Sequence, residues 1–289
     1  MQKIIIRQLH NMITTFVYFF SAINILLALI MIFYNWKINK NVLFLSLFLI
    51  VFALESTIYS TYTYGGDITY YTFLFIISPL FFLKAPLIFL FVRGIAHDRF
   101  YLRWIDVLHL IPFLIHLSVN IPYLMTSFED KMTISSYALA NLDNFKYLNI
   151  NPFYPNAWNM IARAIQLFLY VVACFVLIRL LKPRFIYLTG QLKFQYNYTV
   201  IRLKILLFMI LLIVTVQNLV NYMYFNEALV KNYSDIIYFM LDLVMFVYFA
   251  IPLFVLLCPK MLYGMPHLET KHVSAYQFDN AKKGADKGK

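Results

Sequence analysis

The sequence predicts an all-α, polytopic integral membrane protein whose seven transmembrane helices pack as a bundle. Two features of the composition support this class: 62% of the residues are hydrophobic and only 13% are charged, whereas about 25% are charged in an ordinary soluble domain. The third observation is that apolar runs of about 20 residues recur, each long enough to cross about 30 Å of hydrocarbon. A transmembrane β-barrel would instead show short segments of alternating polarity.

Seven apolar runs account for residues 1–263, which we expect to form one helical domain. They cover residues 12–33, 42–62, 71–92, 104–124, 158–181, 201–222 and 236–257. Tyr and Trp stand at many of their ends, as is typical of side chains at a membrane surface. Residues 264–289 are polar and lysine-rich, and we expect a disordered tail there. The first run is too long for the apolar core of a cleavable signal peptide.

Lysine and arginine predict the orientation of these runs. One side of the predicted membrane holds 17 of them and the other side holds 5, and cytoplasmic loops carry the excess. The N-terminus is therefore expected outside and the C-terminus inside. The short loop that contains Arg99 is strongly basic, and Arg93 and Arg103 stand at its two ends. Because the basic residues flank apolar runs, the net charge of +11 indicates membrane topology, and we expect no direct contact with nucleic acid.

Polar residues recur at one depth in the predicted outer leaflet. Ionisable groups within spans are costly and therefore indicate function. At a rise of about 1.5 Å per residue, Glu55, Arg163 and Asp242 lie roughly 8–10 Å from the outer ends of their spans. Four amide side chains share this level: Gln166, Gln217, Asn218 and Asn221. We expect an outward-facing ligand-binding pocket in which Arg163 pairs with Glu55 or Asp242. The alternative is a structural ion pair, or side chains that extend to the membrane surface.

Lys84 lies deeper in the third run, about 20 Å from its outer end, between Pro79 and Pro86. The two prolines should bend the helix and free backbone carbonyls. Lys84 could reach Glu55 only at a stretch, so the favoured interpretation is that its amine meets the freed carbonyls or extends toward the cytoplasm.

Three titratable side chains share one face of the fourth run: Asp106, His109 and His116. They lack the spacing of a zinc motif, so packing or hydrogen bonding is favoured, and no metal or other cofactor is expected. No nucleotide-binding or hydrolase motif occurs. The two cysteines, Cys174 and Cys258, are expected to be buried apolar residues without a disulfide.

One motif within residues 84–115 comprises Ala85, Pro86, Leu87, Phe89, Phe91, Val92, Arg93, Trp104, Asp106, Leu108, His109, Pro112 and Phe113, with Gln166 and Tyr170 farther along. This motif resembles the membrane-sensor region of bacterial membrane-bound AraC-type transcriptional regulators. Ala85, Phe89 and Phe91 stand where that family more often has Gly or Tyr. In that family a helix-turn-helix domain follows the last span, whereas only a polar tail follows it here. The resemblance thus implies a truncated regulator or a stand-alone relative that signals through a partner.

These observations predict a sensor in the bacterial cytoplasmic membrane that binds a small external or lipid-derived signal. The residues expected to relay the signal inward are Lys84, Pro86, Arg93, Asp106 and His109. Membrane lipids, a cytoplasmic regulator or another membrane subunit are the expected partners, and a homo-oligomer remains open. The alternatives are a lipid-modifying membrane enzyme that uses Asp106, His109 and His116, or a transporter or scaffold subunit.

Overall fold

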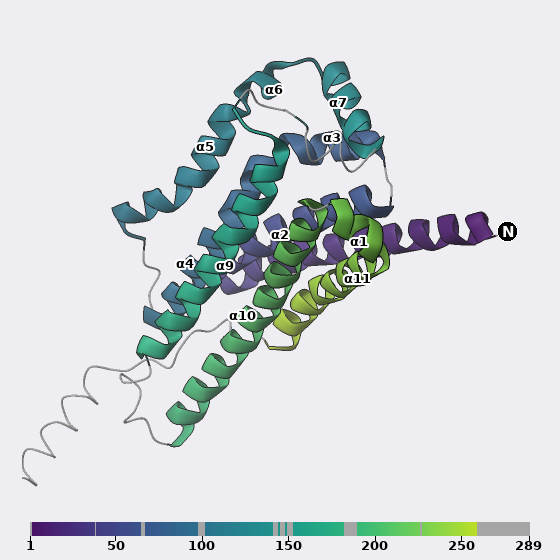
Figure 1. The fold of residues 1–289 in the computed structure, drawn as a ribbon. Coiled ribbons are helices and arrows are strands. Elements are labelled where there is room, and N and C mark those ends of the chain that lie inside the picture. Colours follow the sequence, from purple (N-terminus) through teal and green to yellow (C-terminus); the bar gives the residue numbers. More distant parts are fainter. Residues whose placement is uncertain are drawn as a thin grey trace, which may run out of the picture.

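A computed structural model describes residues 2–37, 39–64, 67–97, 102–140, 144, 148, 153–181, 190–225 and 227–258. Its regular elements in this part of the chain are all helical (Figure 1), which confirms the predicted all-α class. Arg99 and the predicted tail at residues 264–289 lie outside the described residues.

Six helices form a closed ring around a continuous apolar core. In order around the ring they are α1 (Gln2–Asn35), α2 (Val42–Tyr64), α4 (Lys84–His97), α9 (Asn156–Leu181), α10 (Gly190–Phe225) and α11 (Glu227–Leu257). Each contacts the next, and α11 closes the ring against α1. The core includes Phe48, Phe91, Leu167, Leu207 and Ile251, all at most 1% exposed. The ring thus brings together helices that are far apart in the sequence.

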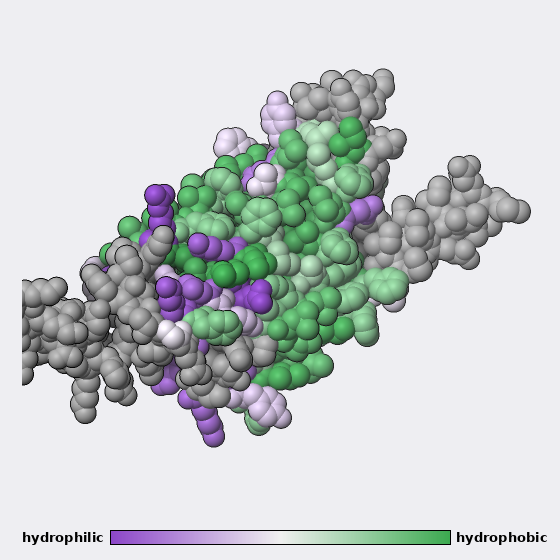
Figure 2. All heavy atoms as spheres, turned by 90° about the horizontal axis from the view of Figure 1, so that it is seen from below, coloured by the Kyte–Doolittle hydropathy of each residue, from purple (hydrophilic) through white to green (hydrophobic). Residues whose placement is uncertain are grey.

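Four helical stretches are long and apolar enough to cross a membrane by length and composition. They are Thr15–Asn35, Ser78–His97, Asn156–Leu180 and Lys193–Met223. Three shorter apolar helices lie on the other predicted runs: Val42–Ile58, Trp104–Val119 and Asp242–Leu257. Figure 2 shows that hydrophobic residues cover much of one face of the molecule, while hydrophilic residues gather toward one end. Such a surface suits contact with lipid.

The third predicted span is not one continuous helix. It divides into α3 (Ile68–Ile76), the 3₁₀ helix η1 (Ser78–Leu83) and α4. The carboxylate of Asp67 caps α3 by accepting a hydrogen bond from the Tyr70 amide, and Pro79 opens η1. As a result α3 lies across the end of the bundle, while α4 runs along α9 (Figure 1). The predicted bend is present, but it occurs at the first proline alone, because Pro86 lies in the first turn of α4, where a proline is tolerated.

The fourth predicted span is also broken, and it lies outside the ring. It consists of the 3₁₀ helix η2 (Trp104–Leu110), α5 (Ile111–Val119) and α6 (Ile121–Met125). Pro112 and Pro122 stand in the first turns of α5 and α6, where they terminate the preceding turn of helix. Helix α5 packs mainly on η1 and leans away from the other helices in Figure 1.

The segment between the fourth and fifth predicted spans contains a helix, α7 (Phe128–Ala140), that packs on α3. A second, smaller apolar cluster forms there from Tyr71, Phe75, Tyr123, Ala138 and Leu148. Buried Lys131 donates hydrogen bonds to the carbonyls of Leu124 and Thr126, at 3.0 and 2.5 Å, and so satisfies carbonyls at the end of α6. This segment is therefore a packed cap over one end of the bundle.

Candidate functional site

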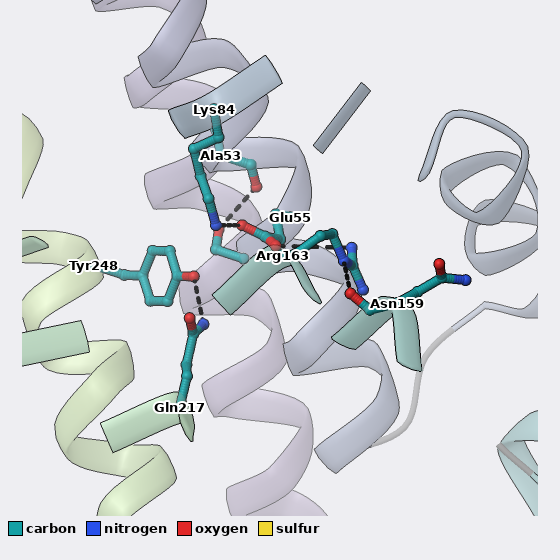
Figure 3. Close-up of polar contacts among 8 residues, drawn as sticks. Ala53, Glu55, Lys84, Asn159, Arg163, Gln217 and Tyr248 are labelled. Carbon is teal, nitrogen blue, oxygen red and sulfur yellow. Dashed lines mark hydrogen bonds and ion pairs between the residues drawn. The ribbon is translucent and has the colours of Figure 1, made fainter. Parts of the chain in front are cut away.

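A buried ion cluster joins three helices of the ring. Glu55 on α2 forms an ion pair with Lys84, the first residue of α4, and both side chains are 3% exposed. An Nη of Arg163 on α9 lies 3.8 Å from the other oxygen of the Glu55 carboxylate. Figure 3 shows the carboxylate between the two cations. We call Glu55, Lys84 and Arg163 the Glu55 cluster. It carries two formal positive charges and one negative charge.

The pairing of Lys84 with Glu55 corrects the favoured interpretation from the sequence. The expected depth of Lys84 assumes one continuous helix from residue 71, but α3 does not run along the bundle. The crossing stretch begins at Ser78, so Lys84 lies only six residues along it, or about 9–12 Å at α-helical and 3₁₀ rises. That is the level of Glu55. An ion pair, and not a set of freed carbonyls, therefore neutralises the buried amine.

Arg163 is held more loosely than Lys84. Its Nε donates a hydrogen bond to the carbonyl of Asn159, one turn earlier in α9, at 3.3 Å. The guanidinium lies 5.5 Å from the centre of the Phe81 ring, a cation–π distance. The contact with Glu55 at 3.8 Å is an ion pair and is too long for a hydrogen bond. With 14% of its side chain exposed, Arg163 is the most accessible member of the cluster.

The predicted amide residues have different surroundings. Gln217 on α10 donates a hydrogen bond to the Tyr248 hydroxyl on α11 at 2.9 Å, and Figure 3 shows this pair beside the Glu55 cluster. Asn218 bonds back to the Val214 carbonyl of its own helix at 2.9 Å. The buried amide nitrogens of Gln166 and Asn221 have no hydrogen-bond partner among the described residues. Gln217 thus joins a polar contact between helices, Asn218 does not, and Gln166 and Asn221 retain unused donors.

Asp242 does not join the buried cluster. Its side chain is exposed on α11, so of the two carboxylates predicted as partners of Arg163, Glu55 lies within ion-pair distance. The expected pairing of Arg163 with Glu55 or Asp242 is therefore made with Glu55. Depth along a span does not by itself decide which side chains face inward, because the rotation of a helix about its axis also matters. Six residues after Asp242, Tyr248 does face inward, since its ring lies 4.2 Å from that of Phe52, one turn before Glu55.

Sequence reasoning missed the polar seam between α1 and α2. The buried residues of α1 recur at spacings of three and four: Val17, Ser21, Asn24, Ala28 and Met31. The Ser21 hydroxyl lies 3.0 Å from the hydroxyl of Ser56, the residue that follows Glu55 in the sequence. Small or polar residues are common where membrane helices approach closely. The heptad-like spacing is visible in the sequence and could have revealed this seam.

A second cluster joins the far end of α4 to η2 and α9. The Arg93 guanidinium donates two hydrogen bonds to the Asp106 carboxylate, at 2.7 and 2.5 Å. The same carboxylate also accepts a hydrogen bond from the backbone amide of Arg103 at 2.7 Å. A nitrogen of His109 lies 3.8 Å from Asp106, and its other ring nitrogen lies 2.6 Å from the Tyr170 hydroxyl. The rings of Phe89, His109 and Tyr170 pack edge to face. These residues form the Arg93 cluster: Phe89, Arg93, Asp106, His109 and Tyr170.

The Arg93 cluster corrects the expected end of the third span. Helix α4 continues to His97, so Arg93 is a buried helical residue and not the first residue of a loop. The bidentate pair with Asp106 provides the compensation that a buried guanidinium requires. The predicted relay residues Arg93, Asp106 and His109 therefore lie in contact, whereas Lys84 and Pro86 lie at the opposite end of the same helix.

His116 has partners different from those of Asp106. It lies 3.2 Å from the Tyr154 hydroxyl and 2.9 Å from the Asn120 amide. Burial raises the pKa of the Tyr154 hydroxyl above its usual value. Among the described residues, no group of three or more His, Cys, Asp or Glu side chains could hold a metal ion. Asp106, His109 and His116, the residues of the lipid-modifying alternative, are therefore divided between two sites: Asp106 and His109 lie in the Arg93 cluster, and His116 lies with Asn120 and Tyr154. Cys174 and Cys258 are buried and free.

Comparison of the chain with protein-family models, curated proteins and solved structures finds no match. The geometry of the chain itself is therefore the basis for inferring its function. That geometry offers two ionic clusters, one at each end of α4.

Proposed function

We propose that this protein is a membrane sensor of the bacterial cytoplasmic membrane, with seven membrane passes, the N-terminus outside and the C-terminus inside. In this proposal a small external or lipid-derived molecule binds at the Glu55 cluster. A shift of α4 then carries the signal to the Arg93 cluster near the cytoplasm, for a cytoplasmic regulator or another membrane subunit to read. The asymmetry of basic residues and the seven apolar stretches support the topology.

The single observation that carries this proposal is the position of α4 between two ionic clusters. Its first residue, Lys84, pairs with Glu55, and Arg93 in its later turns pairs with Asp106. The two positions are nine residues apart, about 13 Å along a helix. A helix is stiff over that distance, so a change in the ion pair at one end displaces the other end. One element whose position two sites bias is the minimum requirement for coupling between them.

Hydrogen exchange tests the coupling without requiring the ligand. Glu55→Gln removes the carboxylate that holds α4 to α2, so amide exchange around η2 should accelerate in protein reconstituted in nanodiscs. Arg179→Gln is the matched control, since Arg179 is an exposed cation in the last turn of α9, and it should leave η2 unchanged. If the Glu55→Gln protein folds and its η2 region exchanges at the wild-type rate, α4 does not relay and the sensor proposal fails.

Cysteine labelling tests the topology. Single cysteines at Ser136 in α7 and at Lys193 near the start of α10 occupy exposed positions on opposite sides of the proposed membrane. A membrane-impermeant maleimide added to intact spheroplasts should label Ser136→Cys and spare Lys193→Cys until the cells are lysed. Labelling of both positions in intact spheroplasts would contradict the proposed orientation. Background from Cys174 and Cys258 should be low because both are buried.

A further inference from the structure

The Glu55 cluster contains more positive than negative charge, and this excess lies where water is scarce. Lys84 and Glu55 are each 3% exposed at the side chain, and Arg163 is 14% exposed. Glu55 is the carboxylate that both Lys84 and Arg163 contact, one at each oxygen, so the two cations lie near enough to repel each other. Buried charge without compensation is costly. An additional negative group beside Arg163 would complete the charge balance.

The hydrogen-bonding groups of Arg163 are also incompletely used. A guanidinium has five N–H donors arranged as a planar fork. Among the described residues, the hydrogen bond of this side chain is from Nε to the Asn159 carbonyl, while the contact of Nη1 with Glu55 is longer than a hydrogen bond. The terminal nitrogens can therefore bind the two oxygens of a carboxylate or phosphate side by side, the geometry that arginine favours.

A second unused donor lies about one helical turn from Arg163 on α9. The amide nitrogen of Gln166 is buried and has no hydrogen-bond partner within the part of the chain that the structure describes. Gln166 is three residues after Arg163, so both project from the same side of α9. Buried donors without partners are uncommon and call for an explanation. Both Arg163 and Gln166 need a hydrogen-bond acceptor, and Arg163 also needs negative charge. An anionic oxygen group supplies both.

We infer that the Glu55 cluster binds an anionic oxygen group, a phosphate or a carboxylate, through Arg163 and Gln166. This inference rests on the binding site in the proposed function and specifies the chemistry of its ligand. Glu55 competes with the ligand for Arg163, so binding weakens the Arg163–Glu55 contact. Glu55 then keeps its ion pair with Lys84 alone. Because Lys84 begins α4, the redistribution of charge acts on the helix that joins the two clusters. The group can belong to a soluble molecule or to a lipid headgroup.

The test measures thermal stability of the full chain in phosphatidylcholine nanodiscs. Three probes are compared at matched ionic strength: inorganic phosphate, acetate, and nanodiscs in which a quarter of the lipid is phosphatidylglycerol. At least one probe should raise the melting temperature of the wild type in a saturable manner. A response to phosphate or acetate identifies a soluble anion, and a response confined to phosphatidylglycerol identifies a lipid headgroup.

Variants assign the response to the cluster. Arg163→Gln should weaken the response about tenfold or more, since hydrogen bonds between charged groups are the strong ones. Arg163→Lys should retain only part of it, because lysine lacks the planar fork. Glu55→Gln should respond to lower probe concentrations than the wild type, because the competing carboxylate is gone. Arg179→Gln serves as the control for surface charge and should respond as the wild type does.

Two results would overturn the inference: no probe stabilises the wild type, or Arg163→Gln and the wild type respond equally. The hydrogen-exchange experiment on η2 uses no anion, so the two ideas can fail separately. If exchange at η2 accelerates but no anion stabilises the protein, the sensor proposal stands and its ligand belongs to another chemical class. An anion response without a change at η2 leaves a binding site that does not signal.

Discussion

The shared carboxylate makes a quantitative prediction: Glu55→Gln should be far more damaging than Lys84→Met. At an effective dielectric constant of about 20, unit charges 4 Å apart interact by about 4 kcal/mol, and Glu55 attracts two cations, with Arg163 at 3.8 Å. Glu55→Gln removes both attractions and leaves two buried cations facing each other, which should cost about 3–5 kcal/mol. Lys84→Met removes one attraction and also the repulsion between the cations, so about 1–2 kcal/mol is expected.

The assay is equilibrium unfolding in mixed micelles of a mild detergent and SDS, followed by tryptophan fluorescence. The double variant Glu55→Gln/Lys84→Met should recover about 1–3 kcal/mol of the loss in Glu55→Gln, since it removes one unpaired cation. A Lys84→Met protein as unstable as Glu55→Gln, or strictly additive effects in the double variant, would refute the shared-carboxylate reasoning. Arg179→Gln should unfold as the wild type does, because Arg179 is exposed.

Three further perturbations probe the neighbourhood of α4, the Arg93 cluster and the cap that contains α7. A methyl group at Gly94 would lie 2.0 Å from the side-chain oxygen of Asn41, the residue before α2. Gly94→Ala should therefore displace the buried Asn41 side chain and lower the melting temperature by a few degrees. Adding Asn41→Ala should restore much of the loss, and failure to do so would show that the clash is not the cause. Asp106→Asn leaves buried Arg93 without its carboxylate partner and should lower the free energy of unfolding by about 3 kcal/mol in the same mixed-micelle assay. A loss below about 0.5 kcal/mol would indicate that the Arg93–Asp106 pair is solvated. Lys131→Met removes two hydrogen bonds to the end of α6 and should increase protease cleavage of α7 without affecting hydrogen exchange around η2.

Parts of the two clusters could be anticipated from individual residues. Glu55 and Arg163 are costly within apolar runs, and they do lie together. Phe89, Arg93, Asp106 and His109 belong to the motif at residues 84–115, but their contact with one another and with Tyr170 is visible only in the structure. Asp242 shows the limit of this approach, because depth along a span is readable from the sequence whereas rotation about the helix axis depends on the neighbouring helices.

The sequence alone determined that this chain is helical and largely apolar, because the length and hydrophobicity of each run are local properties, and it indicated which charged residues demand a partner. Only the tertiary structure decided who those partners are. The turn of the chain before Pro79 lays α3 across the end of the bundle and thereby brings Lys84 to the level of Glu55. The physical reason is that an ion pair depends on distances in space to a few ångströms, and one break in a helix shifts every later residue by more than that.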